Sequence, residues 1–117
     1  MAKILIADDE PEIRGLLEIF FKKKGFETVV GKDGEDALKV ADTVKGIDIV
    51  ILDHRMPKLE GIGVLKELRG KQFKAPVIIL TGSFGGEKKM EGVSAVFMKP
   101  IDLEKLLEKV KELLGMR

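Results

Sequence analysis

Five short apolar runs recur along the chain, and longer stretches with apolar residues at helical spacing separate them. The length of these runs and their Val and Ile content predict β-strands. The predicted strands cover residues 3–7, 26–30, 48–52, 76–80 and 93–98. The regular alternation of strands with helical stretches predicts an α/β fold.

Two helices are predicted strongly. The first begins at Pro11 and stops at Gly25, residue types that suit a first helical turn and a helix end. The last is capped by Asp102 and stopped by Gly115. Both carry an apolar stripe at helical spacing. The stripe residues are Ile13, Leu16, Leu17, Phe20 and Phe21 in the first helix, and Leu103, Leu106, Leu107, Val110, Leu113 and Leu114 in the last.

Weaker helical patterns cover residues 34–44 and 60–69, and Gly61 and Gly63 dilute the second because glycine is unfavourable in a helix interior. The element order is therefore (βα) repeated five times. Such an order implies parallel strands, right-handed crossovers and helices on both faces of the sheet, which is a three-layer sandwich. We expect residues 1–117 to form one such domain, without an output domain.

The strand compositions also predict the order of the sheet. Three of the predicted strands are almost wholly apolar, as central parallel strands are, whereas the second contains Glu27 and Thr28 and the fifth contains Ser94. The second and fifth strands are therefore placed at the edges. The economical order is 2-1-3-4-5, the flavodoxin-like arrangement, whose switch point lies between strands one and three.

Composition excludes several classes of function. The chain has 117 residues, of which 44% are hydrophobic and 35% charged, and its net charge is +1. No apolar run approaches the ~18 residues of a membrane span, so we expect no membrane insertion. The two signs of charge are mixed, which argues against direct binding of nucleic acid. The lack of cysteine excludes disulfides and thiolate metal sites and suits a cytoplasmic protein. We expect a monomer.

Four of the five predicted strands end in residues that can carry chemistry. Asp8 and Asp9 follow the first strand, Asp53 the third, Thr81 the fourth and Lys99 the fifth. The carboxyl ends of parallel strands meet at one edge of the sheet. Three carboxylates brought together there repel one another unless a cation compensates them. A hard oxygen-seeking ion, most plausibly Mg²⁺, suits such a site.

These residues also suit phosphoryl transfer, in which a carboxylate attacks the phosphorus and the equatorial oxygens must be neutralised. Asp53 is the best candidate nucleophile because it is the single acid at a central strand end. The Lys99 ammonium and the Thr81 hydroxyl can help to neutralise the oxygens. Considered alone, each motif has an ordinary structural explanation: Asp8-Asp9 as a helix cap, Thr81 as a turn residue and Lys99 as a solvated cation. Only the combination favours a functional site.

The combination resembles the receiver domain of two-component response regulators, along the whole chain. The motifs that carry the resemblance are Asp8-Asp9, Asp53 followed by Met56-Pro57, Thr81-Gly82 and Lys99-Pro100. The resemblance implies that Asp53 accepts phosphate from a sensor histidine kinase or a phosphotransfer protein. It also implies that Asp9 and Asp53 hold Mg²⁺. The Arg55 backbone carbonyl and, through a water, Asp8 complete that set.

The resemblance implies three further properties. Thr81 and Lys99 engage the phosphoryl oxygens, and the bond between Lys99 and Pro100 is cis. Kinases of the family commonly dock on the first helix and on the loop after the fifth strand. In this chain those surfaces correspond to Ile13, Leu16 and Pro100.

Two features depart from the family pattern. The family usually has Phe or Tyr three residues before the lysine, where this chain has Val96. Phe97 follows and should point to the opposite face of the strand, which argues against a rotamer-coupled aromatic switch. The stretch from Thr81 to Lys99 is also shorter than usual and contains Gly85-Gly86, which predicts a short or poorly ordered fourth helix.

The leading interpretation is a stand-alone receiver that relays phosphate or signals by a conformational change. It is a phosphoacceptor that assists its own phosphorylation and dephosphorylation, rather than an enzyme. A first alternative is a Mg²⁺-dependent phosphatase or phosphotransferase acting on a small substrate, which usually needs a cap or substrate loops. A second is a flavodoxin, but Asp8-Asp9-Glu10 would repel the flavin phosphate after strand one.

Overall fold

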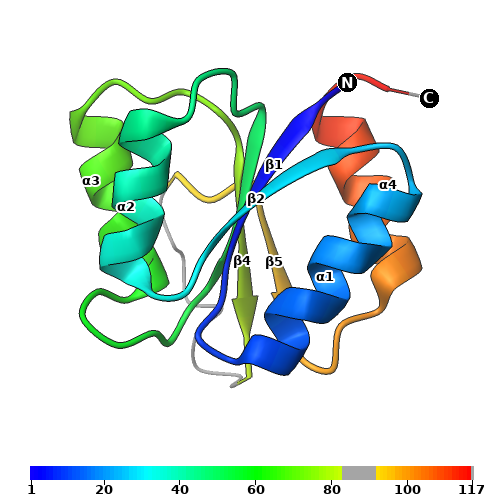
Figure 1. Cartoon of the computed structure of the whole chain (residues 1–117), viewed down its shortest axis with the longest axis horizontal. Coiled ribbons are helices and arrows are strands. Elements are labelled where there is room, and N and C mark those ends of the chain that lie inside the picture. Colours follow the sequence, from blue (N-terminus) through cyan, green and yellow to red (C-terminus); the bar gives the residue numbers. More distant parts are fainter. Residues whose placement is uncertain (83–91, 117) are drawn as a thin grey trace.

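A computed structural model shows five parallel strands in one sheet, with helices packed on both of its faces (Figure 1). The structure describes residues 1–82 and 92–116. The strands are β1 (Lys3–Ala7), β2 (Glu27–Gly31), β3 (Ile49–Asp53), β4 (Val77–Thr81) and β5 (Ala95–Met98). The helices of the described part are α1 (Pro11–Lys23), α2 (Gly34–Thr43), α3 (Gly61–Gly70) and α4 (Leu103–Leu113).

The strand order β2-β1-β3-β4-β5, with every pair parallel, confirms the predicted topology. β1 has its predicted bounds, β2, β3 and β4 lie one residue later, and β5 begins two residues later. This shift matters because the ladder continues through Asp53, which pairs with Leu80, and through Thr81, which pairs with Met98. Asp53 and Thr81 are therefore the last residues of hydrogen-bonded strands and not loop residues.

Side chains of the central strands alternate between two apolar layers. In β1, Ile4 and Ile6 face the layer covered by α1 and α4, whereas Leu5 and Ala7 face the layer covered by α2 and α3. Figure 1 shows the two helix pairs on opposite sides of the sheet. Burial on both faces explains why these strands are continuous apolar runs in the sequence. The predicted three-layer sandwich is confirmed.

The strongly predicted helices end where the sequence indicates. α1 starts at Pro11 and stops at Lys23, and Gly25 follows with φ of +94°, a conformation that favours glycine. In α4 the Asp102 side chain accepts a hydrogen bond of 3.2 Å from the backbone N–H of Lys105. This bond satisfies one of the free N–H groups of the first turn.

The two glycines in the first turn of α3, Gly61 and Gly63, lie against close neighbours. A Cβ atom on Gly61 would lie 2.6 Å from the Asp53 carbonyl oxygen, and one on Gly63 would lie 2.6 Å from a methyl group of Leu59. The Gly61 N–H also donates to the His54 carbonyl at 2.9 Å. The low helix propensity of this segment therefore reflects the direct packing of α3 against the strand that carries Asp53.

Val96 and Phe97 of β5 point to opposite faces, as the alternation predicts. Val96 is 36% exposed, and Phe97 packs against the apolar layer under α1 and α4. The fourth helix expected between Thr81 and Lys99, with Gly85-Gly86, falls outside the described residues. Among the helices that the structure describes, none is long and apolar enough to cross a membrane.

Candidate functional site

The chemistry-bearing residues lie at the carboxyl edge of the sheet, where β1, β3, β4 and β5 end. An open pocket of about 520 Å³ is found at this edge. It is lined by Asp9, Glu10, Asp53, Arg55, Gly82 and Lys99. Asp8 is fully buried beside it, and Asp53 is 5% exposed. The pocket therefore joins an accessible mouth to carboxylates that water hardly reaches.

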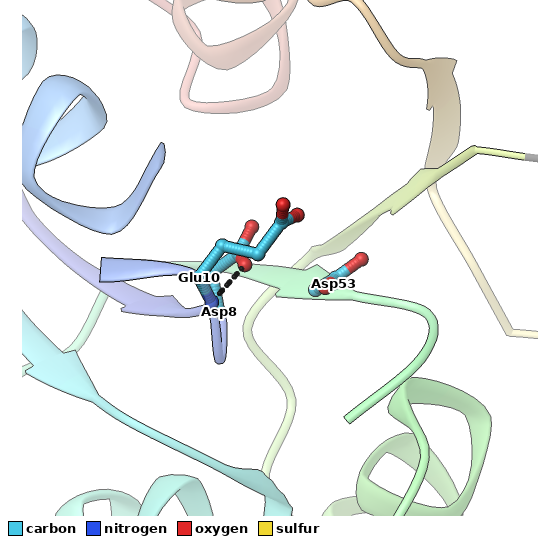
Figure 2. A group of neighbouring side chains, drawn as sticks. All are labelled: Asp8, Glu10 and Asp53. Carbon is cyan, nitrogen blue, oxygen red and sulfur yellow. Dashed lines mark hydrogen bonds between the residues drawn. The ribbon is translucent and has the colours of Figure 1, made fainter. Parts of the chain in front are cut away.

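Asp8 is fixed by hydrogen bonds on three sides. One oxygen of its carboxylate, Oδ1, accepts a bond of 2.9 Å from the Glu10 N–H, which Figure 2 shows as a dashed line. Its backbone carbonyl accepts from Arg14 Nη1 at 2.7 Å, and its N–H donates to the Gly31 carbonyl at 3.2 Å. The other carboxylate oxygen, Oδ2, is buried without a hydrogen-bond partner in the described structure. Its nearest cation is Lys99, at 3.4 Å.

Lys99 is the cationic centre of the described site. Its Nζ lies 2.8 Å from Glu10 Oε1, 3.3 Å from Asp53 Oδ1 and 3.4 Å from Asp8 Oδ2. Its backbone N–H donates to the Thr81 carbonyl at 2.7 Å. Burial lowers the pKa of the ammonium, but the hydrogen bond to Glu10 and the charges of Asp8 and Asp53 outweigh it and raise the pKa overall. Lys99 therefore stays charged.

The surroundings that keep Lys99 charged disfavour the ionised form of Asp53. Burial and, next, the negative charge of Asp8 raise the pKa of its carboxyl to about 7, although Lys99 opposes the shift. A hydrogen bond with Asp9 adds to the increase. One ammonium is thus too little positive charge for the carboxylates around it.

A divalent cation fits this imbalance. Carboxylate oxygens of Asp8, Glu10 and Asp53 all lie within 4.8 Å of one another, and Figure 2 shows the three side chains grouped at the strand ends. The partnerless Oδ2 of Asp8 is the kind of buried acceptor that a hard cation or one of its waters satisfies. The site thus has the donor chemistry of an oxygen-ligated magnesium site.

Glu10 belongs to this group although the sequence analysis assigned it no role at the site. It directly follows Asp8-Asp9 and precedes α1, and this position was the available signal. Asp9, which was predicted as a ligand, lines the pocket but is exposed and lies outside the tight group of three. Arg55 also lines the pocket. Thr81 is 2% exposed at the end of β4.

An apolar pocket of about 210 Å³ adjoins the acidic one. It is lined by Ile13, Leu16, Leu17, Lys99, Pro100, Ile101 and Leu103. Leu16 is 53% exposed, so its side chain lies partly free on α1. The bond between Lys99 and Pro100 is cis, as the resemblance implies. Lys99 lines both pockets, so a molecule bound in the apolar one would lie next to Lys99, whose Nζ is 3.3 Å from Asp53 Oδ1.

The family model described as "Response regulator receiver domain" matches residues 4–111. The chain belongs to this family. The receiver domain is 36% identical to the response regulator protein TrrA of Thermotoga maritima, whose solved structure is a complex with Mg(2+)-BeF. The TM-score is 0.88, and the match covers 97% of this chain and 100% of that one. Receiver domains are signalling proteins that accept phosphate, and this chain has an acidic cluster of the kind that such chemistry needs.

Two curated relatives differ in the share of their length that this chain matches. The Bacillus subtilis alkaline phosphatase synthesis transcriptional regulatory protein PhoP is 43% identical over 79 residues, which are 68% of this chain and 32% of PhoP. The chain therefore spans about a third of that relative. The sporulation initiation phosphotransferase F of B. subtilis is 35% identical over 120 residues, covering 98% of this chain and 95% of that protein.

Proposed function

We propose that this receiver domain accepts a phosphoryl group on Asp53 in a Mg²⁺-dependent reaction. The observation that carries the proposal is the position of Asp53. Its buried carboxylate lies at the end of a central strand, 3.3 Å from Lys99, and lines an acidic pocket. Phosphoryl transfer needs a nucleophile and fixed positive charge at one point, and little other covalent chemistry from the protein.

Mg²⁺ would be held by Asp9 and Asp53, with the Arg55 backbone carbonyl as a further ligand and Asp8 acting through a water. Bound there, the ion supplies positive charge that offsets the carboxylates and the phosphoryl oxygens. All four residues lie in or beside the same pocket. The similarity to TrrA, which was solved in complex with Mg(2+)-BeF, supports Mg²⁺ as the ion.

The chain's own residues would act in a defined order. An Asp53 oxygen attacks the phosphorus, the bond from phosphorus to the donor breaks, and the leaving group departs with the electron pair and takes a proton from solvent. The Lys99 ammonium then pairs with a phosphoryl oxygen, to which the Thr81 hydroxyl donates a hydrogen bond. Because only ionised Asp53 is nucleophilic, its raised pKa of about 7 limits the metal-free protein near neutral pH.

The phosphoryl donor would be a histidine kinase or a phosphotransfer protein that docks on Ile13, Leu16 and Pro100. These residues line the apolar pocket, which shares Lys99 with the acidic pocket. A partner helix seated there would bring its histidine to Asp53 while apolar contacts hold it.

The phosphorylated domain would relay its group or change its conformation to signal. Similarity to sporulation initiation phosphotransferase F over nearly the whole of both chains supports a relay. Similarity to transcriptional regulators such as PhoP supports an output role. The family match favours either role over a phosphatase that acts on a small substrate.

Intact-mass measurement after incubation with acetyl phosphate tests the proposal. Wild type, Asp53→Asn and the control Asp42→Asn are compared with Mg²⁺ and with a chelator. Asp42 is a suitable control because its side chain is 54% exposed in a pair with Lys71 on the protein surface. We expect one added phosphoryl group in wild type and in the control, only with Mg²⁺, and none in Asp53→Asn. Addition that persists in Asp53→Asn would contradict the proposal.

A further inference from the structure

Glu10 makes the shortest contact of Lys99, although the proposed phosphoryl transfer assigns it no task. Its Oε1 lies 2.8 Å from Lys99 Nζ, compared with 3.3 Å for Asp53 and 3.4 Å for Asp8. The Glu10 side chain is 57% exposed, whereas that of Lys99 is 18% exposed. The ammonium is thus bound from the mouth of the pocket, on the side from which a donor arrives.

The backbone holds Glu10 in this position. Its N–H donates to Asp8 Oδ1 at 2.9 Å, and its carbonyl accepts from the Arg14 N–H at 2.9 Å. Figure 2 shows the Glu10 side chain extending past the Asp8 carboxylate from this anchored backbone. Pro11 follows and restricts the chain further. The contact with Lys99 therefore starts from a fixed point, and only the side-chain torsions of Glu10 must be ordered.

The carboxylate of Glu10 has no structural task in the helix that follows. Glu10 occupies the N-cap position of α1, but its side chain makes no capping hydrogen bond. A change from carboxylate to amide therefore leaves the start of α1 intact. The effect of such a change on the site can be separated from an effect on folding.

We propose that Glu10 is a positioning residue that tethers Lys99 in the unphosphorylated site and thereby slows phosphorylation of Asp53. Lys99 Nζ already faces three carboxylates, of which Glu10 is the nearest, so a phosphoryl oxygen must compete with Glu10 for it. The free Glu10 carboxylate also repels the incoming anion at the mouth of the pocket. The inference rests on the proposed function, since the tether acts on the same phosphoryl transfer.

The rate of phosphorylation by acetyl phosphate, at saturating Mg²⁺, tests the tether. Glu10→Gln keeps the size of the side chain and removes its charge, and we expect it to react about two- to fivefold faster, as befits a partly exposed ion pair. Salt should shrink the difference, because the Glu10 end of the pair is open to solvent. Glu12→Gln is the matched control: it removes the same charge from an exposed position in the first turn of α1 and should react at the wild-type rate.

A second measurement reports on the contact itself. The Lys99 side chain is titrated by NMR in wild type and in Glu10→Gln. Since the hydrogen bond to Glu10 raises the pKa of Lys99, the variant should show a lower pKa. A role for Glu10 that is only structural would leave this pKa unchanged.

The possible failures are distinguishable. If wild type gains no phosphoryl group, the proposed function fails. If wild type is phosphorylated but Glu10→Gln reacts at the same rate or more slowly, the tether is overturned while the proposed function stands. A slower variant that also binds Mg²⁺ more weakly would instead make Glu10 a metal ligand.

Discussion

β1 and β3 run side by side at the centre of the sheet, and each combines an apolar body with an acidic end. The bodies, residues 4–7 and 49–52, are 0–1% exposed and fill the two apolar layers. The ends, Asp8 and Asp53, are 0% and 5% exposed. Burial of the bodies stabilises the fold. The same burial at the ends removes carboxylates from water and raises the pKa of Asp53 to about 7. Burial therefore stabilises the fold through the apolar residues of β3 and disfavours the ionised carboxylate at the end of the same strand.

The largest expected effect is a loss of stability when a cavity is made in the apolar part of β3. Ile51 is fully buried in the layer under α1 and α4, so Ile51→Ala leaves a cavity there. We expect the free energy of unfolding, measured with urea, to fall by about 3 kcal/mol. Ile19 is the matched control because it is 57% exposed on α1, and Ile19→Ala should change stability by no more than about 0.5 kcal/mol. Equal losses in the two variants would show that the strand body does not dominate stability.

The next largest effect concerns the packing of α3 against the end of β3, where Asp53 lies. In Gly61→Ala the new Cβ would lie 2.6 Å from the Asp53 carbonyl oxygen, so α3 or the end of β3 must move. We expect a loss of about 1–3 kcal/mol in urea unfolding. Phosphorylation by acetyl phosphate should also slow, because Asp53 shifts relative to Lys99. Gly70→Ala in the same helix is the control, since nothing lies within 4 Å of its Cβ position and its stability should not fall. A stable, fully active Gly61→Ala would contradict the packing argument.

Removing the acidic end should stabilise the metal-free protein. The pKa of Asp53 is about 7 in the folded state, against 3.8 for an aspartate carboxyl in water. As pH rises from about 4 to about 7 the unfolded state releases this proton first, so the stability falls, and above about pH 7 the penalty is complete. Asp53→Asn lacks this penalty but also removes one partner of Lys99. We therefore expect a net gain of about 1–2 kcal/mol at about pH 8.

Urea unfolding of wild type and Asp53→Asn across this pH range, in chelator, measures the gain. The gain should decrease as the pH falls and vanish only below about pH 3, where Asp53 is protonated in both states. Addition of Mg²⁺ should stabilise wild type more than the variant, because binding to the folded state alone raises stability. Parallel pH curves for the two proteins would mean that burial of Asp53 has no electrostatic penalty.

The strands and the acidic ends were predictable from the sequence because burial on both faces requires continuous apolar runs. The third strand was predicted to end at residue 52, one residue before its observed end at Asp53. The contact between Glu10 and Lys99 was not predictable. It depends on the turn set by the Asp8–Glu10 hydrogen bond and on a side-chain conformation, and 89 residues separate the partners. The role of Gly61 also needed the structure, because its low helix propensity points away from the close packing that requires it.

The smallest effect comes from a carboxylate that remains in water. Asp42 pairs with Lys71 at 3.0 Å, and the two side chains are 54% and 48% exposed. Asp42→Asn should change the free energy of unfolding by less than about 0.5 kcal/mol, because solvent screens the pair and ordering two side chains offsets its attraction. The same urea titrations measure it, and its pH curve should follow that of wild type. A gain as large as that of Asp53→Asn would remove burial as the cause of the Asp53 penalty. A negligible change would assign that penalty to the burial of the acid at the end of a central strand, where a cation can offset it.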